Sequence, residues 1–165
     1  MTGTRWLDAD EQDTWRAFLW TSRLLNEALD RQLQRDSGMP HAYYMILAML
    51  SEAPGRARTM TDLAAIVHSS PSRLSHAVNR LEEAGWVRRV KHETDRRTTI
   101  AKLTEEGFAV LAEAAPGHVA EVRRNLFTPL DREQMLGFRK TLHTLLDSLD
   151  PDREAPCTAT SAEPQ

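Results

Sequence analysis

Residues 59–104 of this chain read TMTDLAAIVHSSPSRLSHAVNRLEEAGWVRRVKHETDRRTTIAKLT. This stretch predicts a helix, a short turn, a second helix and then a two-stranded ribbon with a basic tip. Thr59 and Asp62 have capping-box spacing, so the threonine oxygen can accept a hydrogen bond from a free N–H at the start of the first helix. Apolar residues follow at helical spacing as far as Val67, after which polar residues interrupt the pattern.

The second helix has clearer boundaries. Ser70 is a favourable N-cap residue, and Pro71 fits the first helical position because its missing N–H costs nothing there. Gly85 ends the helix, since glycine adopts the left-handed conformation of a helix C-terminus without strain. One face is apolar, and the other carries six polar side chains with no acidic residue among them: Ser72, Arg73, Ser75, His76, Asn79 and Arg80.

The polar face of the second helix has the side chains that base edges and phosphates require. A solvated helix face would more often mix both charge signs, as residues 1–50 do. Here short hydroxyls permit close approach, Arg suits guanine, Asn suits adenine, and cations suit the DNA backbone. We therefore expect the major groove to be contacted by Ser70, Ser72, Arg73, Ser75, His76 and Asn79, and phosphates by Arg80, Arg88 and Lys91.

Two short β-prone runs, at residues 86–90 and 98–100, predict the strands of the ribbon. Basic residues outnumber acidic ones between them, and a thin hairpin cannot bury such charges, so its tip must project into water or against an anion. A basic β-wing beside a polar second helix describes a winged helix-turn-helix. The expected fold class is therefore mainly α with a small β-wing, in which further N- and C-terminal helices serve dimerisation.

A resemblance to the MarR family of bacterial transcription regulators lies in residues 81–107, LEEAGWVRRVKHETDRRTTIAKLTEEG. In that family a helix end leads through glycine into a wing with Asp-x-Arg, followed by a strand and Leu-Thr-x-x-Gly. The matching residues here are Asp95, Arg96, Arg97, Leu103, Thr104 and Gly107. The resemblance implies that Arg97, aided by Arg96 and oriented by Asp95, enters the minor groove, whose negative potential attracts arginine. It also implies that the helix from Pro71 lies in the major groove.

The residues before this stretch predict two helices. Asp8 and Glu11 indicate a capping box that opens a helix to about Gln34, which is about 39 Å long and therefore long enough to serve an interface. A second helix from Pro40 is apolar on nearly all sides, which places it at the centre of the domain. Residues 56–58 then fall in a loop.

The residues after the wing predict further helices. One begins at Thr104, and we expect a kink or a break at Pro116 because proline removes a backbone donor and clashes with the preceding turn. The last helix begins at Asp131 and has apolar residues at coiled-coil spacing up to Leu149. The tail from Pro151 is poor in apolar residues, so we expect it to be disordered.

The 165 residues suit one domain, expected over residues 1–150, followed by the disordered tail at residues 151–165. Within the domain, residues 40–103 form the winged helix-turn-helix lobe, and residues 8–35 and 104–149 form dimerisation helices. A homodimer is expected on a palindromic site, because two winged units about 34 Å apart contact successive major grooves. The alternative is that the terminal apolar stripes complete the core of a monomer.

The charge distribution suits a DNA-binding protein although the net charge is −3. Residues 56–102 have a balance of +5 and the remainder −8, so the acidic remainder turns one basic face towards DNA. No apolar run is long enough to span a membrane, and the polar N-terminus is no secretory signal. Cys157 is the single cysteine, which excludes an intramolecular disulfide and suits a cytoplasmic protein.

No catalytic motif is present, which argues against an enzyme. The histidines lack ligand spacing, so we expect no metal site, no cofactor and no convergence of His41, His118 and His143. Some members of the MarR family sense peroxide with a cysteine near the start of the first helix. The only cysteine of this chain lies in the tail, so thiol sensing is not expected.

A small organic effector is the remaining regulatory option, because ligands of the MarR family often lodge between the dimer helices and the DNA-binding lobe. The candidate effector pocket comprises Trp15, Trp20, His41 and Tyr44. The simpler interpretation of these aromatics is core and interface packing. The sequence thus predicts a transcriptional regulator that binds double-stranded DNA, acting as a ligand-responsive repressor. A winged-helix protein–protein interaction module is the alternative.

Overall fold

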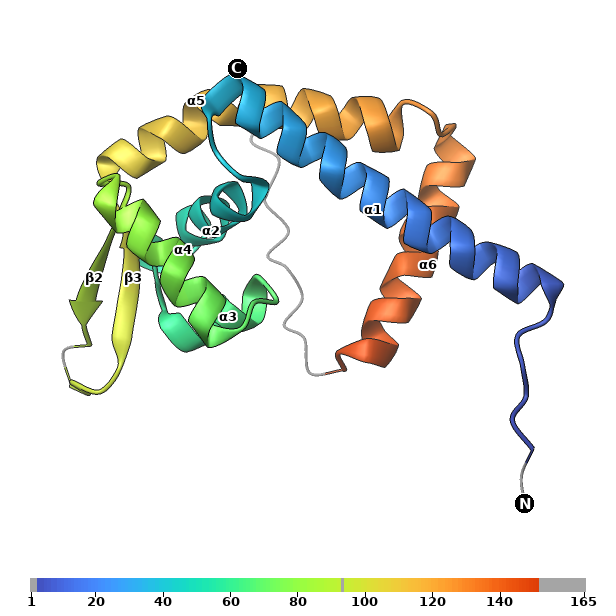
Figure 1. Cartoon of the computed structure of the whole chain (residues 1–165), viewed down its shortest axis with the longest axis horizontal. Helices are drawn as coiled ribbons and strands as arrows, with labels where there is room; N and C mark the ends of the chain where they lie inside the picture. The colour runs from blue at the N-terminus through green and yellow to red at the C-terminus, as the bar shows by residue number, and fades with distance from the viewer. Residues whose placement is uncertain (1–2, 93, 152–165) are drawn as a thin grey trace. The chain divides into compact units, whose positions relative to one another are not determined.

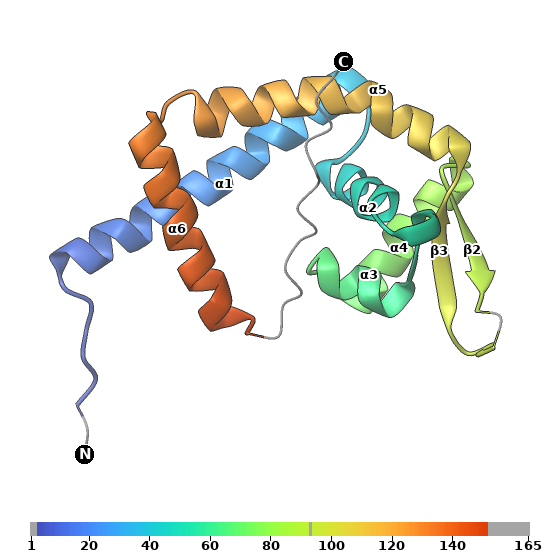
Figure 2. The same cartoon turned by 180° about the vertical axis from the view of Figure 1, so that it is seen from behind.

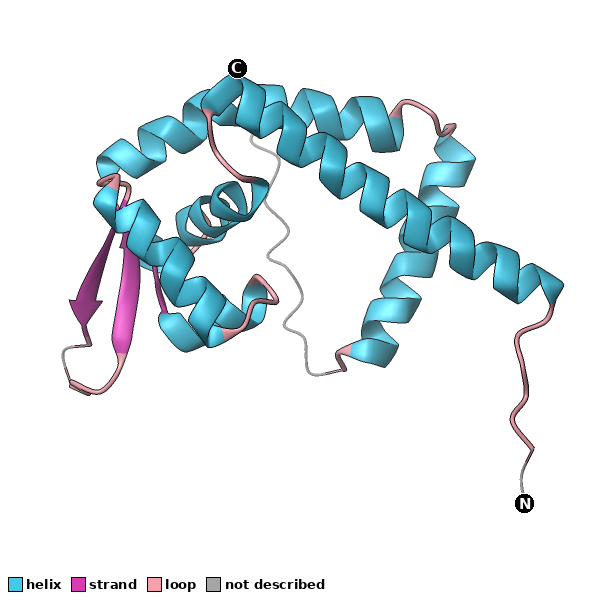
Figure 3. Ribbon diagram, in the orientation of Figure 1, coloured by secondary structure: helices cyan, strands magenta, loops and turns pink. Residues whose placement is uncertain are grey.

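A computed structural model describes residues 3–92 and 94–151. Mostly helical structure with a small antiparallel sheet confirms the expected fold class (Figure 1, Figure 3). Residues up to Leu126 form one compact unit and residues from Phe127 onward a second, while the single domain expected over residues 1–150 stays a prediction. In chain order the main elements are α1 (Ala9–Ser37), α2 (His41–Ser51), β1 (Ala57–Thr59), α3 (Met60–Ile66), α4 (Pro71–Glu83), β2 (Val87–Lys91), β3 (Thr99–Leu103), α5 (Glu105–Val122) and α6 (Arg132–Leu149).

The first helix, α1, begins with the predicted capping box. The Asp8 carboxylate accepts a hydrogen bond from the Glu11 N–H at 2.9 Å, and the Glu11 carboxylate accepts one from the Asp8 N–H at 3.0 Å. The helix ends at Gly38, whose φ of +62° lies in the left-handed region that glycine adopts without strain. With 29 residues, α1 is about 43 Å long, and its residues 9–21 are exposed.

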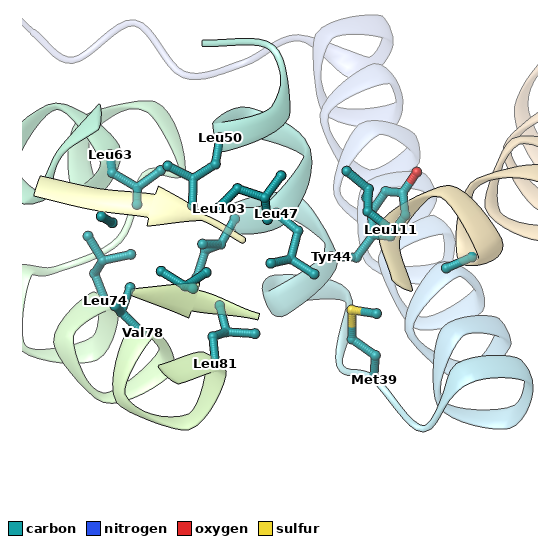
Figure 4. Close-up of a cluster of buried hydrophobic side chains, with 14 of the residues drawn as sticks. Met39, Tyr44, Leu47, Leu50, Leu63, Leu74, Val78, Leu81, Leu103 and Leu111 are labelled. Atoms are coloured by element: carbon teal, nitrogen blue, oxygen red, sulfur yellow. The ribbon is translucent and has the colours of Figure 1, made fainter. Parts of the chain in front are cut away.

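The core of the first unit surrounds α2, as its apolar sequence predicts. This helix contacts α1, α3, α4, α5 and the sheet, and its Leu47 and Leu50 are fully buried. Figure 4 shows both leucines gathered with Leu63 from α3 and with Val78 and Leu81 from α4. Burial of one such side chain contributes about 1.5–3 kcal/mol, so this cluster holds α3 and α4 against α2.

The wing belongs to a three-stranded sheet, which corrects the predicted two-stranded ribbon. The strand order is β1-β3-β2, both pairs are antiparallel, and β2 and β3 form a hairpin whose far end points away from α5 (Figure 2). The added strand, β1, covers residues 57–59, where the sequence predicts a loop. Three residues are too few to show alternation, so pairing with β3, with Arg58 opposite Ala101, decides the structure of β1.

The Leu-Thr-x-x-Gly segment joins the wing to α5. Thr104 donates its N–H to the Trp86 carbonyl at 3.0 Å and its hydroxyl to the Gly85 carbonyl at 2.7 Å. The same hydroxyl accepts the Gly107 N–H at 3.0 Å, which caps α5. A Cβ added at Gly107 would lie 2.1 Å from the Trp86 carbonyl oxygen. Only glycine therefore fits this contact without a shift of the backbone.

The fifth helix, α5, continues through Pro116, so there is no break at this proline, and the alternative, a kink, stays a prediction. Leu111 and Ala114 before the proline and His118 after it are all buried, in a helix that packs against α1 and α2. Proline removes one backbone hydrogen bond, and burial on both sides of it outweighs that loss. The helix ends instead in a π-helical turn at residues 123–127.

In the second unit, α6 begins where the sequence predicts, at Asp131, and its start is a capping box. The Asp131 carboxylate accepts the Gln134 N–H at 2.8 Å, and the Gln134 side-chain oxygen accepts the Asp131 N–H at 3.0 Å. The predicted apolar stripe of α6 includes large exposed side chains, namely Phe138, Leu145, Leu146 and Leu149.

Two of the sequence-based predictions concern residues near the C-terminus. Residues 152–165, which include Cys157 and nearly all of the tail predicted to be disordered, lie outside the described residues.

Within the part of the chain that is described, no helix combines the length and the apolar character that a membrane crossing requires.

Candidate nucleic-acid interface

The fourth helix, α4, separates an apolar face from the predicted polar face. Leu74, Val78 and Leu81 are at most 1% exposed and belong to the core. Ser70 caps the helix by accepting the Arg73 N–H at 3.3 Å. The polar face thus lies on the surface of the first unit, with Ser75 half-buried and the other side chains exposed: Ser72, Arg73, His76, Asn79 and Arg80.

The strands of the wing carry cations in the same unit as α4. Arg88 lies opposite Lys102, and Lys91 lies opposite Thr99. The Lys91 ammonium donates to the Thr99 hydroxyl at 3.1 Å. Both Arg88 and Lys91 are exposed, as a phosphate contact requires.

Asp95 organises the turn of the wing. Its carboxylate accepts the Thr98 hydroxyl at 2.6 Å and the Arg97 N–H at 3.0 Å. These two bonds, the hydroxyl bond foremost, lower the pKa of the Asp95 carboxyl below its ordinary value because they favour the charged form. Asp95 therefore holds the Arg97 backbone rather than the guanidinium. The Arg96 and Arg97 side chains are exposed at this turn.

Arg89 is a site residue that sequence reasoning misses. Its guanidinium donates to the Ser75 carbonyl at 2.9 Å, to the Ser75 hydroxyl at 3.3 Å and to the side-chain oxygen of Asn79. It also pairs with the Glu82 carboxylate at 3.1 Å, and that carboxylate accepts the Arg89 backbone N–H at 2.8 Å. Strand alternation could have indicated this link, because neighbouring Arg88 and Arg89 must point to opposite faces of β2.

A cavity of about 410 Å³ lies between the wing and the start of α4. Pro71 and Ser75 line it from α4, Arg89 lines it from β2, and Arg97 lines it from the turn of the wing. The structure therefore brings Arg97 to the same hollow as the polar face of α4.

The cavity of about 410 Å³ is lined by none of the four residues of the candidate effector pocket. Trp15 and Trp20 are 50% and 60% exposed on α1, whereas Tyr44 is buried in the core. A second cavity, of about 720 Å³, is bordered by His41 but not by the other three. The effector pocket predicted from the sequence stays a prediction. Other residues around this cavity are Asn26, Tyr43, Arg73, His76 and Arg80.

His41 and His118 come together, which corrects the expectation that these histidines stay apart. Their ring centroids are 5.4 Å apart, and the His118 ring lies 4.2 Å from the Tyr44 ring. Burial lowers the pKa of both imidazoles, and the neighbouring His41 lowers that of His118 further. His143 belongs to α6 in the other unit. Among the residues described, no three metal-ligating side chains form a group.

Known proteins resemble this chain in sequence and in structure. A family model described as MarR family matches residues 37–98. The structure is similar to that of Sco3205, a MarR family transcriptional regulator from Streptomyces coelicolor in complex with DNA. The two chains are 46% identical, the match covers 92% of this chain and 95% of that chain, and the TM-score is 0.86.

Two further similarities cover most of the chain. AbsC, a MarR family transcriptional regulator from Streptomyces coelicolor, is 42% identical, with 88% of this chain and 98% of that chain covered and a TM-score of 0.83. The HTH-type transcriptional repressor YetL from Bacillus subtilis (strain 168) is 24% identical over 143 residues, which are 87% of this chain and 84% of that protein.

Proposed function

This chain belongs to the MarR family of transcriptional regulators, and on that premise we propose that it is a repressor that binds a palindromic site in double-stranded DNA as a homodimer. The observation that carries the proposal is the shared surface of α4 and the wing in the first unit. The helix offers hydroxyl, imidazole, amide and guanidinium groups to base edges. The wing offers Arg97, an exposed cation suited to the negative potential of a minor groove.

Exposed cations on α4 and on the wing can exchange their present contacts for phosphate. Arg80 pairs with Glu83 at 3.0 Å, but both side chains are well exposed, and an exposed pair of this kind contributes little stability. Arg73, Arg88 and Lys91 are exposed as well. Phosphate contacts by such residues would hold the dimer on the duplex, while the helix face selects the bases.

Exposed apolar side chains support the homodimer. On α1, Trp15 and Leu19 are four residues apart and are 50% and 45% exposed. On α6, Leu145 and Leu149 have the same spacing and are 48% and 80% exposed. Apolar stripes on exposed helices are typical of interfaces, because a partner removes their surface from water. A second copy of the chain would cover them and place two α4 helices on successive major grooves.

The cavity of about 720 Å³ supports regulation by a small ligand. Its volume is in the range of pockets for small organic molecules. His41 borders it from α2, and Arg73 and His76 border it from the polar face of α4. A ligand in this cavity would contact side chains that the proposal assigns to DNA, so ligand and DNA would affect each other's affinity.

Selection of bound duplexes from a random pool tests the proposal. We expect enrichment of a palindrome with half-site centres about 10 base pairs apart, bound by a dimer. Affinity should fall steeply with salt, because phosphate contacts release counterions. A reporter gene behind the selected site should be expressed less when the protein is present. A protein partner that binds independently of DNA and salt, with no duplex selected, would contradict the proposal.

A further inference from the structure

The Arg89 side chain fixes the orientation of the Asn79 amide. An arginine has five N–H donors and no acceptor, so the Asn79 atom that faces it must be the carbonyl oxygen, Oδ1. The guanidinium is itself held by the Ser75 carbonyl at 2.9 Å and by the Glu82 carboxylate at 3.1 Å. With its side chain 24% exposed, Arg89 is also partly shielded from water. The Asn79 oxygen thus points to β2, which leaves the Nδ2 group for other partners.

The Asn79 group that remains for a base is a donor. An asparagine recognises adenine through two bonds, in which Oδ1 accepts from N6 and Nδ2 donates to N7. That arrangement needs both atoms aimed at the base, whereas here Oδ1 is aimed at Arg89. An N–H donor alone matches an acceptor in the major groove. Guanine offers O6 and N7 and thymine offers O4. Adenine also offers N7, but its neighbouring N6 amino group is a donor and would lie beside the Nδ2 donor with no acceptor to bond, and cytosine offers only a donor.

We propose that Arg89 is a positioning residue that makes Asn79 select a keto base, guanine or thymine, at one position of each half-site. This inference rests on the proposed function and specifies the base that the polar face of α4 prefers. It departs from the adenine preference that asparagine alone indicates. Arg89 itself need not touch DNA, because it acts through the Asn79 amide.

The test selects duplexes from a random pool with full-length wild type, Asn79→Ala and Arg89→Met proteins. Asn79→Ala identifies the relevant base position, because preference should relax there. Wild type should prefer guanine or thymine at that position and bind adenine about tenfold more weakly, because the adenine N6 donor opposes the Nδ2 donor; this factor is at the lower end of the discrimination that a base contact gives. Arg89→Met frees the Asn79 oxygen, so the penalty against adenine should disappear.

Arg88→Met is the matched control. Arg88 is the neighbouring residue of β2 and has the same charge, but it is exposed and lies on the other face of the strand. Its loss should weaken binding to all duplexes alike, as expected for a phosphate contact, and leave the base preference unchanged. Thermal unfolding checks that each variant is folded. If Arg89→Met does not fold, the base that wild type prefers at the Asn79 position still tests the inference.

Three results would overturn the inference and leave DNA binding intact. The first is an adenine or cytosine preference of wild type at the Asn79 position. The second is an Asn79→Ala protein with the same preference as wild type at every position. The third is a folded Arg89→Met protein that keeps the keto preference. Failure to select any duplex would overturn the proposed function and this inference with it.

Discussion

A methyl group at Gly107 should destabilise the junction between the wing and α5. In Gly107→Ala the added Cβ would lie 2.1 Å from the Trp86 carbonyl oxygen and 2.9 Å from Leu103 Cδ1. The oxygen belongs to the backbone and accepts the Thr104 N–H at 3.0 Å. Relief therefore requires a shift of the strand or of the helix, because no side-chain rotation removes the clash.

The expected loss is about 2 kcal/mol of unfolding free energy. Overpacking of this kind costs about 1–3 kcal/mol, and the backbone shift also weakens the bond between Thr104 and Trp86, which contributes about 1 kcal/mol. Alanine recovers up to about 1 kcal/mol because it favours helix more than glycine does. A loss of about 2 kcal/mol corresponds to about 4–8 °C in melting temperature for a chain of this size.

Thermal and urea unfolding at one fixed protein concentration measure this loss, since the apparent stability of a dimer depends on concentration. Gly137→Ala is the matched control, because a Cβ at Gly137 in α6 would have nothing within 4 Å. That variant should be more stable than wild type by up to about 1 kcal/mol. Equal stability of Gly107→Ala and wild type would refute the reasoning that the Trp86 contact requires glycine.

Arg97→Ala should lower affinity for the selected duplex about tenfold with an unchanged melting temperature, because it removes an exposed cation from the minor groove; unchanged affinity in a mobility-shift titration would refute the wing assignment. Burial lowers the pKa of His118 below 6.5, so the folded state binds fewer protons than the unfolded state and stability should fall as pH drops below about 6.5. His118→Phe should reduce that slope in urea unfolding, and an equal slope would contradict the burial argument. Leu81→Ala should cost about 2–5 kcal/mol because Leu81 is fully buried, and a loss under about 1 kcal/mol would show that the site closes around the smaller side chain.

The helix boundaries were predictable because their causes are local. Asp8, Ser70 and Asp131 each accept a hydrogen bond from an N–H three residues onward, so the residues that form each cap stand together in the sequence. The two faces of α4 follow from the helical period in the same way. Leu74 and Val78 are buried and His76 is exposed, as the spacing predicts.

Contacts between distant segments were not predictable from local patterns. The strand β1 forms because β3 lies beside it, and nothing in its own three residues indicates this. The pair of His41 and His118 arises from the packing of α2 against α5. In each case the partner element decides the environment of the residue.

The wing is fixed to the rest of the first unit by contacts near its base and along β2. Near the base, Gly107 packs on the Trp86 carbonyl, and along β2 Arg89 bonds to Ser75 and Asn79 of α4. A surface that is ordered before binding loses less conformational entropy in the complex, about 0.5–1.5 kcal/mol for each side chain already immobilised. Arg89, which orders this helix face, also donates a hydrogen bond to the side-chain oxygen of Asn79. Loosening the Arg89 contacts should therefore reduce affinity and base discrimination together, because both depend on the bonds of this one side chain.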